Sequence, residues 1–427
     1  MRLFRYVACL LGFWLTACST VSFDRPGSTD QAPYASLTRY FAEFCALSQI
    51  KQRRGFGAGI RGEIGGHAVF YLHGACRAAE QGQTTIQPCD EPGAEPADGV
   101  GLSMNAHFRN AKWVATPGRD FFFNGGMAAR EPLTKARYDQ VQARARQLGI
   151  YDGVTFHEEV FDDMPAGMDR EWWKYEVSVA TDYAISLGRG RFCARVPVNR
   201  AQLLAMVGFL NAQNAPYREG REVFRWSIFQ DNCIHLAHNA LAAAGVWEEW
   251  PTGRPLLLAM FDFPVPRNEF VNLMRRTGDV SLLDPARLHA DPAARRALLQ
   301  FGQLPLRPGA LMESRPPQEP NEVYETALKL IFYDDPTFGP YQRWFDRIQD
   351  DPRRHDPRSN LAWVAAQYRQ ALAERRPLDW WLARPAHRTR FDPAGFAETY
   401  RQFYALLEQA AALAEARLAS LDGAGRR

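Results

Sequence analysis

The chain has 427 residues, with 51 Lys and Arg against 48 Asp and Glu. That length is enough for two or three domains with real hydrophobic cores. Two of the basic residues, Arg2 and Arg5, lie in the predicted leader described next, so the rest of the chain is close to neutral. A near-neutral chain argues against nucleic acid, or any strongly acidic surface, as the main partner.

The first 17 residues have the pattern of a secretory signal. A positive start at Arg2 and Arg5 is followed by an apolar run over 7–15, which is too short to span a bilayer. The block Leu15-Thr16-Ala17-Cys18 resembles the lipobox of bacterial lipoproteins, in which the chain is cleaved before the cysteine. The resemblance implies a lipid on Cys18, a membrane as partner and an envelope location facing the periplasm or cell surface. Ser19, where an Asp would favour the inner membrane, favours the outer membrane. The alternative is an ordinary signal peptide with a chance cysteine, or a membrane helix.

The predicted elements continue in chain order. A polar, turn-rich tether over 18–34 leads into a mixed domain over 35–250, which we expect to be α+β. Its first element is a predicted helix over 37–47. Period-two or short extended patterns predict strands over 67–73, 101–108, 113–115, 175–187 and 191–196. Helical patterns lie at 133–148, 200–211 and from Asp231 or Asn232 to 244.

The chain changes character after residue 250. Proline-rich connectors separate helical patterns at 269–276, 322–332, 360–375 and 393–421. We therefore expect a helical C-terminal region over 251–427.

The cysteines suggest an oxidising compartment. Cys76 and Cys89 flank a short polar loop and are expected to pair; Cys45 and Cys193 are the second expected disulfide. Cys233 then remains a free thiol. The alternative is that some or all of these cysteines are reduced and buried.

Cys233 is predicted to stand in the first turn of a helix, after a capping Asp231 or Asn232. The unpaired N–H groups and positive dipole end of a helix start stabilise a thiolate and can donate to an oxyanion. His235 and His238 follow, but they do not share one helical face with the cysteine, and no His-Glu-x-x-His signature is present. We expect structural roles for both, although a metal-dependent hydrolase using them with His67 stays open.

A nucleophilic cysteine needs a base, and His67 opens a predicted strand after two glycines. A third polar group should orient its imidazole. The polar face of the strand at 101–108 carries Ser103, Asn105 and His107, and we take Asn105 or His107 as the candidate.

A strand opening with Gly-His, then further strands, then a distant Asn-Cys at a helix start, resembles the circularly permuted papain-like hydrolases of the NlpC type. These are related to lecithin retinol acyltransferase and to periplasmic domains of unassigned substrate. The resemblance implies an antiparallel sheet packed on the nucleophile helix, with His67 as base and Cys233 as nucleophile. It covers roughly 35–250 and says little about the remainder.

The expected function is an envelope cysteine hydrolase or acyltransferase acting on an amide or ester of peptidoglycan, protein or lipid, without metal or cofactor. The alternative is a non-catalytic lipoprotein that binds or assembles an envelope partner on the same scaffold.

Overall fold

The computed structural model describes residues 38–53, 66–78, 85–89, 99–259, 265–279, 281–307, 311–326, 339–384 and 392–424. The predicted signal sequence, the lipid-bearing Cys18 and the tether lie outside these residues. Within the described ranges no helix has the length and apolar character needed to cross a bilayer.

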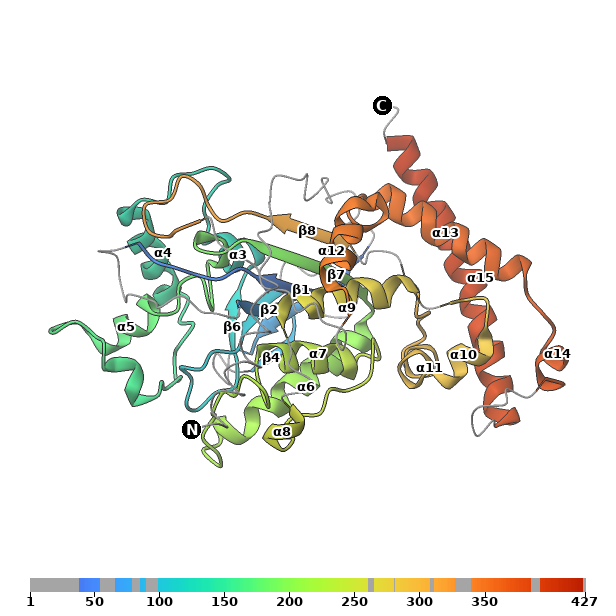
Figure 1. Cartoon of the computed structure of the whole chain (residues 1–427), viewed down its shortest axis with the longest axis horizontal. Helices are drawn as coiled ribbons and strands as arrows, with labels where there is room; N and C mark the ends of the chain where they lie inside the picture. The colour runs from blue at the N-terminus through green and yellow to red at the C-terminus, as the bar shows by residue number, and fades with distance from the viewer. Residues whose placement is uncertain are drawn as a thin grey trace, which may run out of the picture.

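A six-stranded sheet forms the centre of the molecule (Figure 1). All its neighbouring strands are antiparallel, in the order β6-β5-β2-β1-β7-β8. The strands are β1 (Tyr40–Leu47), β2 (His67–His73), β5 (Gly99–Ser103), β6 (Val114–Pro117), β7 (Arg191–Val198) and β8 (Leu311–Arg315). The predicted α+β class is confirmed.

Helices cover one face of this sheet. α6 (Arg200–Arg218) packs on β1 and on α7 (Cys233–Ala243), α7 packs on β2, and α9 (Pro266–Asp279) packs on β1 and β7. The short helix α3 (Arg119–Asn124) packs on β5, β6 and the turn η2 (Ile185–Leu187). Phe122 and Phe123 of α3 join Cys45 and Tyr71 in a small core on the other face.

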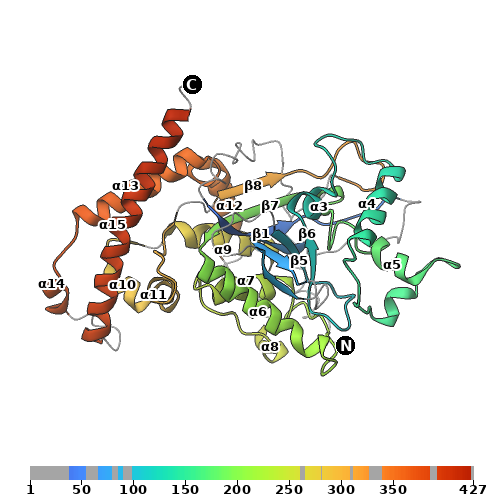
Figure 2. The ribbon, with the colours of Figure 1, turned by 180° about the vertical axis from the view of Figure 1, so that it is seen from behind.

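Smaller elements complete the mixed domain. They are β3 (Ala75–Arg77), β4 (Ile86–Pro88), α4 (Lys135–Gln147), η1 (Glu158–Phe161), α5 (Arg170–Glu176) and α8 (Leu256–Ala259). β3 and β4 pair with each other as a separate antiparallel ribbon. α4 and α5 pack together at the end of the molecule opposite the C-terminal helices (Figure 2).

The C-terminal region has its own hydrophobic core. Its elements are α10 (Pro285–Ala290), α11 (Pro292–Leu299), α13 (Pro357–Ala373), α14 (Leu378–Leu382) and α15 (Pro393–Ala424). Between them, β8 returns to the sheet, and α12 (Tyr341–Asp350) packs on α9 and is followed by the turn η4 (Pro352–Arg354). The boundary predicted at residue 251 therefore does not separate the two cores, because β8, α9 and α12 belong with the sheet.

Three predicted elements are wrong. The predicted helix over 37–47 is strand β1, and every residue of that strand is buried. A central strand covered on both faces loses the polar alternation that identifies strands in sequence. The predicted strand over 175–187 is instead the end of α5, a turn and η2. Ala180 and Ala184 adopt positive φ there, which breaks an extended backbone. The part of the predicted helix at 322–332 that lies inside the described residues is also not helical.

Candidate active site

The two expected disulfides are present and leave one described cysteine outside a disulfide. Cys45 on β1 lies opposite Cys193 on β7 in the sheet register, and the two are bonded. Cys76 and Cys89 are bonded across the β3–β4 ribbon. Cys233 is therefore the cysteine of the described residues that forms no disulfide.

Cys233 is the first residue of α7, as the sequence predicted. The helix cap is Asn232, whose Oδ1 accepts from the backbone N–H of Ile234 at 2.9 Å and of His235 at 3.4 Å. The ring of His235 completes a capping box, with its Nδ1 accepting from the N–H of Asn232 at 3.2 Å. The N–H groups of Ile234 and His235 are thus already committed to the cap, so neither is offered to an oxyanion in this conformation.

Asp231, the other predicted cap, has a different partner. Its Oδ2 lies 2.8 Å from Nζ of Lys112, in the connection between β5 and β6. Burial raises the pKa of the Asp231 carboxyl, and Lys112 opposes this shift. The ion pair fixes the start of α7 to the end of the sheet where β5 finishes.

His67 stands at that same end of the sheet. It is the first residue of β2, which runs antiparallel to β5. Gly66 before it has φ +71, and a Cβ there would meet the carbonyl oxygen of Leu47 at 2.5 Å, so a glycine is required for this close approach. His67 and Cys233 are both nearly buried, with 7% and 9% of their surface exposed.

Ser103 orients the imidazole of His67. Its Oγ lies 3.1 Å from Nε2 of His67 and 2.6 Å from Oδ1 of Asp182. The Ser103 hydroxyl has one proton. If it donates that proton to Asp182, its oxygen accepts a hydrogen bond from Nε2–H of His67, and in this tautomer the lone pair is on Nδ1. An imidazole with a basic Nδ1 is the form that can take a proton from a thiol.

Asp182 is the buried centre of this cluster. Besides Ser103, it accepts from Nδ2 of Asn105 at 3.1 Å and from the hydroxyl of Tyr151 at 2.9 Å. Burial raises its pKa to about 6, although the bonds from Ser103, Asn105 and Tyr151 each lower it. The result is a hydrogen-bonded chain from imidazole to carboxylate, which we call the His67–Ser103–Asp182 relay.

The structure places the two predicted third residues differently. Asn105 joins the cluster through Asp182, which lies behind Ser103, and its Oδ1 accepts from the N–H of His107 at 3.1 Å. The ring of His107 lies against Phe156. Catalytic roles for Asn105 and His107 stay predictions. Sequence reasoning noted Ser103 on the same polar face without selecting it, and it missed Asp182, whose signal was a lone carboxylate inside an apolar run.

The His67–Ser103–Asp182 relay and the thiol of Cys233 approach the start of β2 from opposite faces of the sheet. Strand alternation places His67 with Val69 and Tyr71 on the face that carries the Cys45–Cys193 disulfide, whereas α7 packs on the opposite face. His67 is the first residue of β2 and Cys233 is the first residue of α7. The imidazole and the thiol would therefore meet around the start of β2.

His235 and His238 have structural partners. Burial, with Lys112 and His238 nearby, lowers the pKa of His235 to about 4, so it is neutral at physiological pH. His238 stacks on Trp247, hydrogen-bonds Glu269 through Nδ1, and places Nε2 2.8 Å from the carbonyl oxygen of Glu248. No group of three or more His, Cys, Asp or Glu side chains suited to a metal occurs among the residues that the structure describes.

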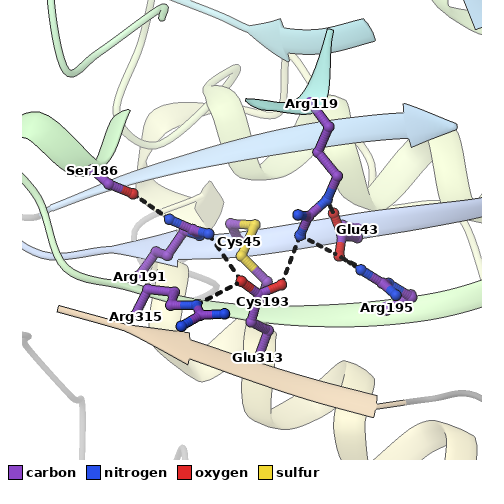
Figure 3. Close-up of a disulfide and its surroundings, with 9 residues drawn as sticks. All are labelled: Glu43, Cys45, Arg119, Ser186, Arg191, Cys193, Arg195, Glu313 and Arg315. Carbon is purple, nitrogen blue, oxygen red and sulfur yellow. Dashed lines mark hydrogen bonds and ion pairs between the residues drawn. A yellow bond between two sulfur atoms is a disulfide. The ribbon is translucent and has the colours of Figure 1, made fainter. Parts of the chain in front are cut away.

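A charged network covers the disulfide on the relay's face of the sheet (Figure 3). Glu43 of β1 is fully buried and accepts from Arg119 and Arg195, and Glu313 of β8 is paired with Arg119, Arg191 and Arg315. Burial alone would raise the pKa of Glu43, but the guanidinium groups of Arg119 and Arg195 hold it below its usual range. This network ties β1, β7, β8 and α3 together.

Searches with the whole chain found no matching family model, no matching curated protein and no matching solved structure.

Proposed function

We propose that the protein is a cell-envelope cysteine hydrolase or acyltransferase of permuted papain-like design, held by lipid on Cys18 at the outer membrane. Its substrate would be an amide or ester of peptidoglycan, protein or lipid. The observation that supports this most is a cysteine outside any disulfide at a capped helix start. That helix start is fixed to the end of the sheet where a serine and a buried carboxylate orient a histidine.

The proposed reaction uses these groups in sequence. The sulfur of Cys233 attacks the carbonyl carbon while its proton passes to Nδ1 of His67. The C–N or C–O bond then breaks, and the leaving amine or alcohol takes that proton. Water, or an acceptor amine or alcohol, then cleaves the thioester and regenerates the thiol.

Ser103 and Asp182 are positioning residues in this scheme. They hold the ring in one tautomer and stabilise the imidazolium that forms, as a carboxylate does behind the histidine of a serine-protease triad.

A second candidate is favoured by the burial of both reactive groups. With less than a tenth of each residue exposed, Cys233 and His67 could serve a non-catalytic envelope factor that keeps the scaffold to bind or assemble a partner. Thiol reactivity separates the two functions without knowledge of the substrate.

The experiment is iodoacetamide labelling of the folded full-length chain, with the Cys233 peptide quantified by mass spectrometry over a pH series. For the enzyme we expect Cys233 to label faster than a cysteine in the unfolded chain near neutral pH. Ser103→Ala should slow labelling about tenfold to a hundredfold by releasing the ring. Ser186→Ala, at a buried serine bonded to Arg191 away from the relay, is the matched control and should leave the rate unchanged.

Labelling slower than in the unfolded chain, with no difference between the two serine variants, would reject the enzyme and favour the binding factor. Where a substrate is found, full activity of Cys233→Ala would have the same meaning.

A further inference from the structure

A separate pocket of about 460 Å³ lies where the sheet meets the C-terminal helices. Its walls come from the start of β1, the end of β7, the loop before β8, and helices α13 and α15, which stand to one side of the sheet in both views (Figures 1 and 2). This volume falls within the range of roughly 300–1,000 Å³ that is typical of small-molecule sites. None of its lining residues belongs to the Cys233 site.

The walls are mainly apolar, and the charged side chains described in them are cationic. The apolar side chains include Val198, Leu304, Leu306, Leu406 and Leu413. The charged residues of the described lining are Arg39, Arg200, Arg307 and Arg417, and no Asp or Glu is among the described lining residues. An apolar pocket with cationic walls fits a molecule that has an apolar body and an anionic end.

Arg307 is the buried member of this set, with 7% of its surface exposed. Its Nη1 donates to neutral acceptors: the carbonyl oxygen of Pro197 and the side-chain oxygens of Gln202 and Gln303. Burial lowers the pKa of Arg307 to about 10, and no Asp or Glu of the described residues is among the charges that shift it. A buried guanidinium without a carboxylate is unfavourable, so an anionic partner would stabilise it.

Unsatisfied polar atoms also gather around this pocket. Oγ1 of Thr38, Nε of Arg200 and Nε of Arg307 are buried and have no hydrogen-bond partner in the described part of the chain. A buried polar group that stays unpaired destabilises the fold.

We propose that this pocket binds a single-chain lipid with an anionic head, a fatty acid being the simplest case. The acyl chain lies against the leucines of α15 and of the loop before β8. The carboxylate faces the arginines, where a guanidinium can hold it with two parallel hydrogen bonds. The site is independent of the thiol chemistry proposed above.

The test is calorimetric titration of the full-length chain with oleate. We expect one saturable site, at least tenfold weaker binding of methyl oleate, and weaker binding of oleate at high salt because the attraction is screened. Ala410→Trp fills the pocket from α15 and should weaken oleate binding at least tenfold. Ala412→Trp, exposed on the same helix and outside the lining, is the matched control and should bind like the unmodified chain.

Charge is tested separately. Arg200→Gln should weaken oleate binding about two- to fivefold, as expected for a partly exposed ionic contact, whereas Arg401→Gln on the exposed side of α15 should have no effect. Cys233→Ala should bind oleate normally, which separates this site from the proposed reaction centre.

Three outcomes would overturn the proposal: no saturable oleate binding, equal loss in Ala410→Trp and Ala412→Trp, or methyl oleate binding as tightly as oleate. Competition by millimolar inorganic phosphate alone, without dependence on the acyl chain, would likewise reject a lipid and indicate a simple anion site.

Discussion

Replacing Glu43 with glutamine should destabilise the fold strongly. The carboxylate is fully buried and accepts four hydrogen bonds, two from Arg119 at 2.9 and 3.1 Å and two from Arg195 at 3.0 and 2.9 Å. Arg119 also reaches Glu313, but Glu43 is the carboxylate that Arg195 contacts within the described residues. Removing the charge leaves Arg195 buried without the carboxylate that it contacts, which costs about 3–5 kcal/mol.

Urea unfolding followed by circular dichroism measures this loss. Glu325→Gln is the control, because its pair with Lys51 is about half exposed and is worth at most about 1 kcal/mol. The double variant Glu43→Gln with Arg195→Met should be less destabilised than Glu43→Gln alone, since it removes the unpaired cation.

The pH dependence has a definite sign. The folded-state pKa of Glu43 is lowered, so its stabilisation is present above its unfolded value of 4.5 and is lost as the pH falls through the folded value. A loss below 1 kcal/mol for Glu43→Gln at pH 7, or no benefit from the second substitution, would refute this account of the network.

Two further predictions concern the candidate site. Asp182 has a folded pKa raised from 3.8 to about 6, so its protonated form favours the folded state and stability falls as the pH rises between these values; the difference amounts to about 3 kcal/mol. Urea unfolding at pH 4 and pH 7 should show this fall in the unmodified chain relative to Asp182→Asn, and parallel curves for the two proteins would contradict it. Asn232→Ala removes the cap of α7 and should lower the free energy of unfolding by about 1 kcal/mol. Asn199→Ala, at the capping box of α6, provides a comparison for a cap remote from the thiol. A change below about 0.3 kcal/mol in Asn232→Ala would show that this cap is not needed to hold the helix start.

The sequence identified the elements whose signal is local. β2 is a short apolar run that follows two glycines, α7 begins with a capping asparagine, and the loop between Cys76 and Cys89 is short enough to suggest their pairing. The Cys45–Cys193 bond joins residues 148 apart, and no local pattern in the sequence indicates it.

What the sequence could not predict depends on contacts made far away. β1 is strand because β2 and β7 pair with it on both sides, while its own residues, all buried, carry no alternation. Asp182 faces Ser103 and Tyr151 through a turn whose backbone has positive φ at two alanines, and alanine gives no warning of that conformation. For this reason the sequence did not single out Asp182.

The position of β8 has a consequence for synthesis and dissection of the protein. This edge strand is made after α10 and α11, yet it supplies Glu313, the carboxylate that neutralises Arg191. Until residue 315 has left the ribosome, the hydrogen-bonding edge of β7 stays open to other chains and Arg191 lacks this counterion. A fragment ending near residue 250 would keep that unfinished edge permanently, and we expect it to aggregate where the whole chain does not.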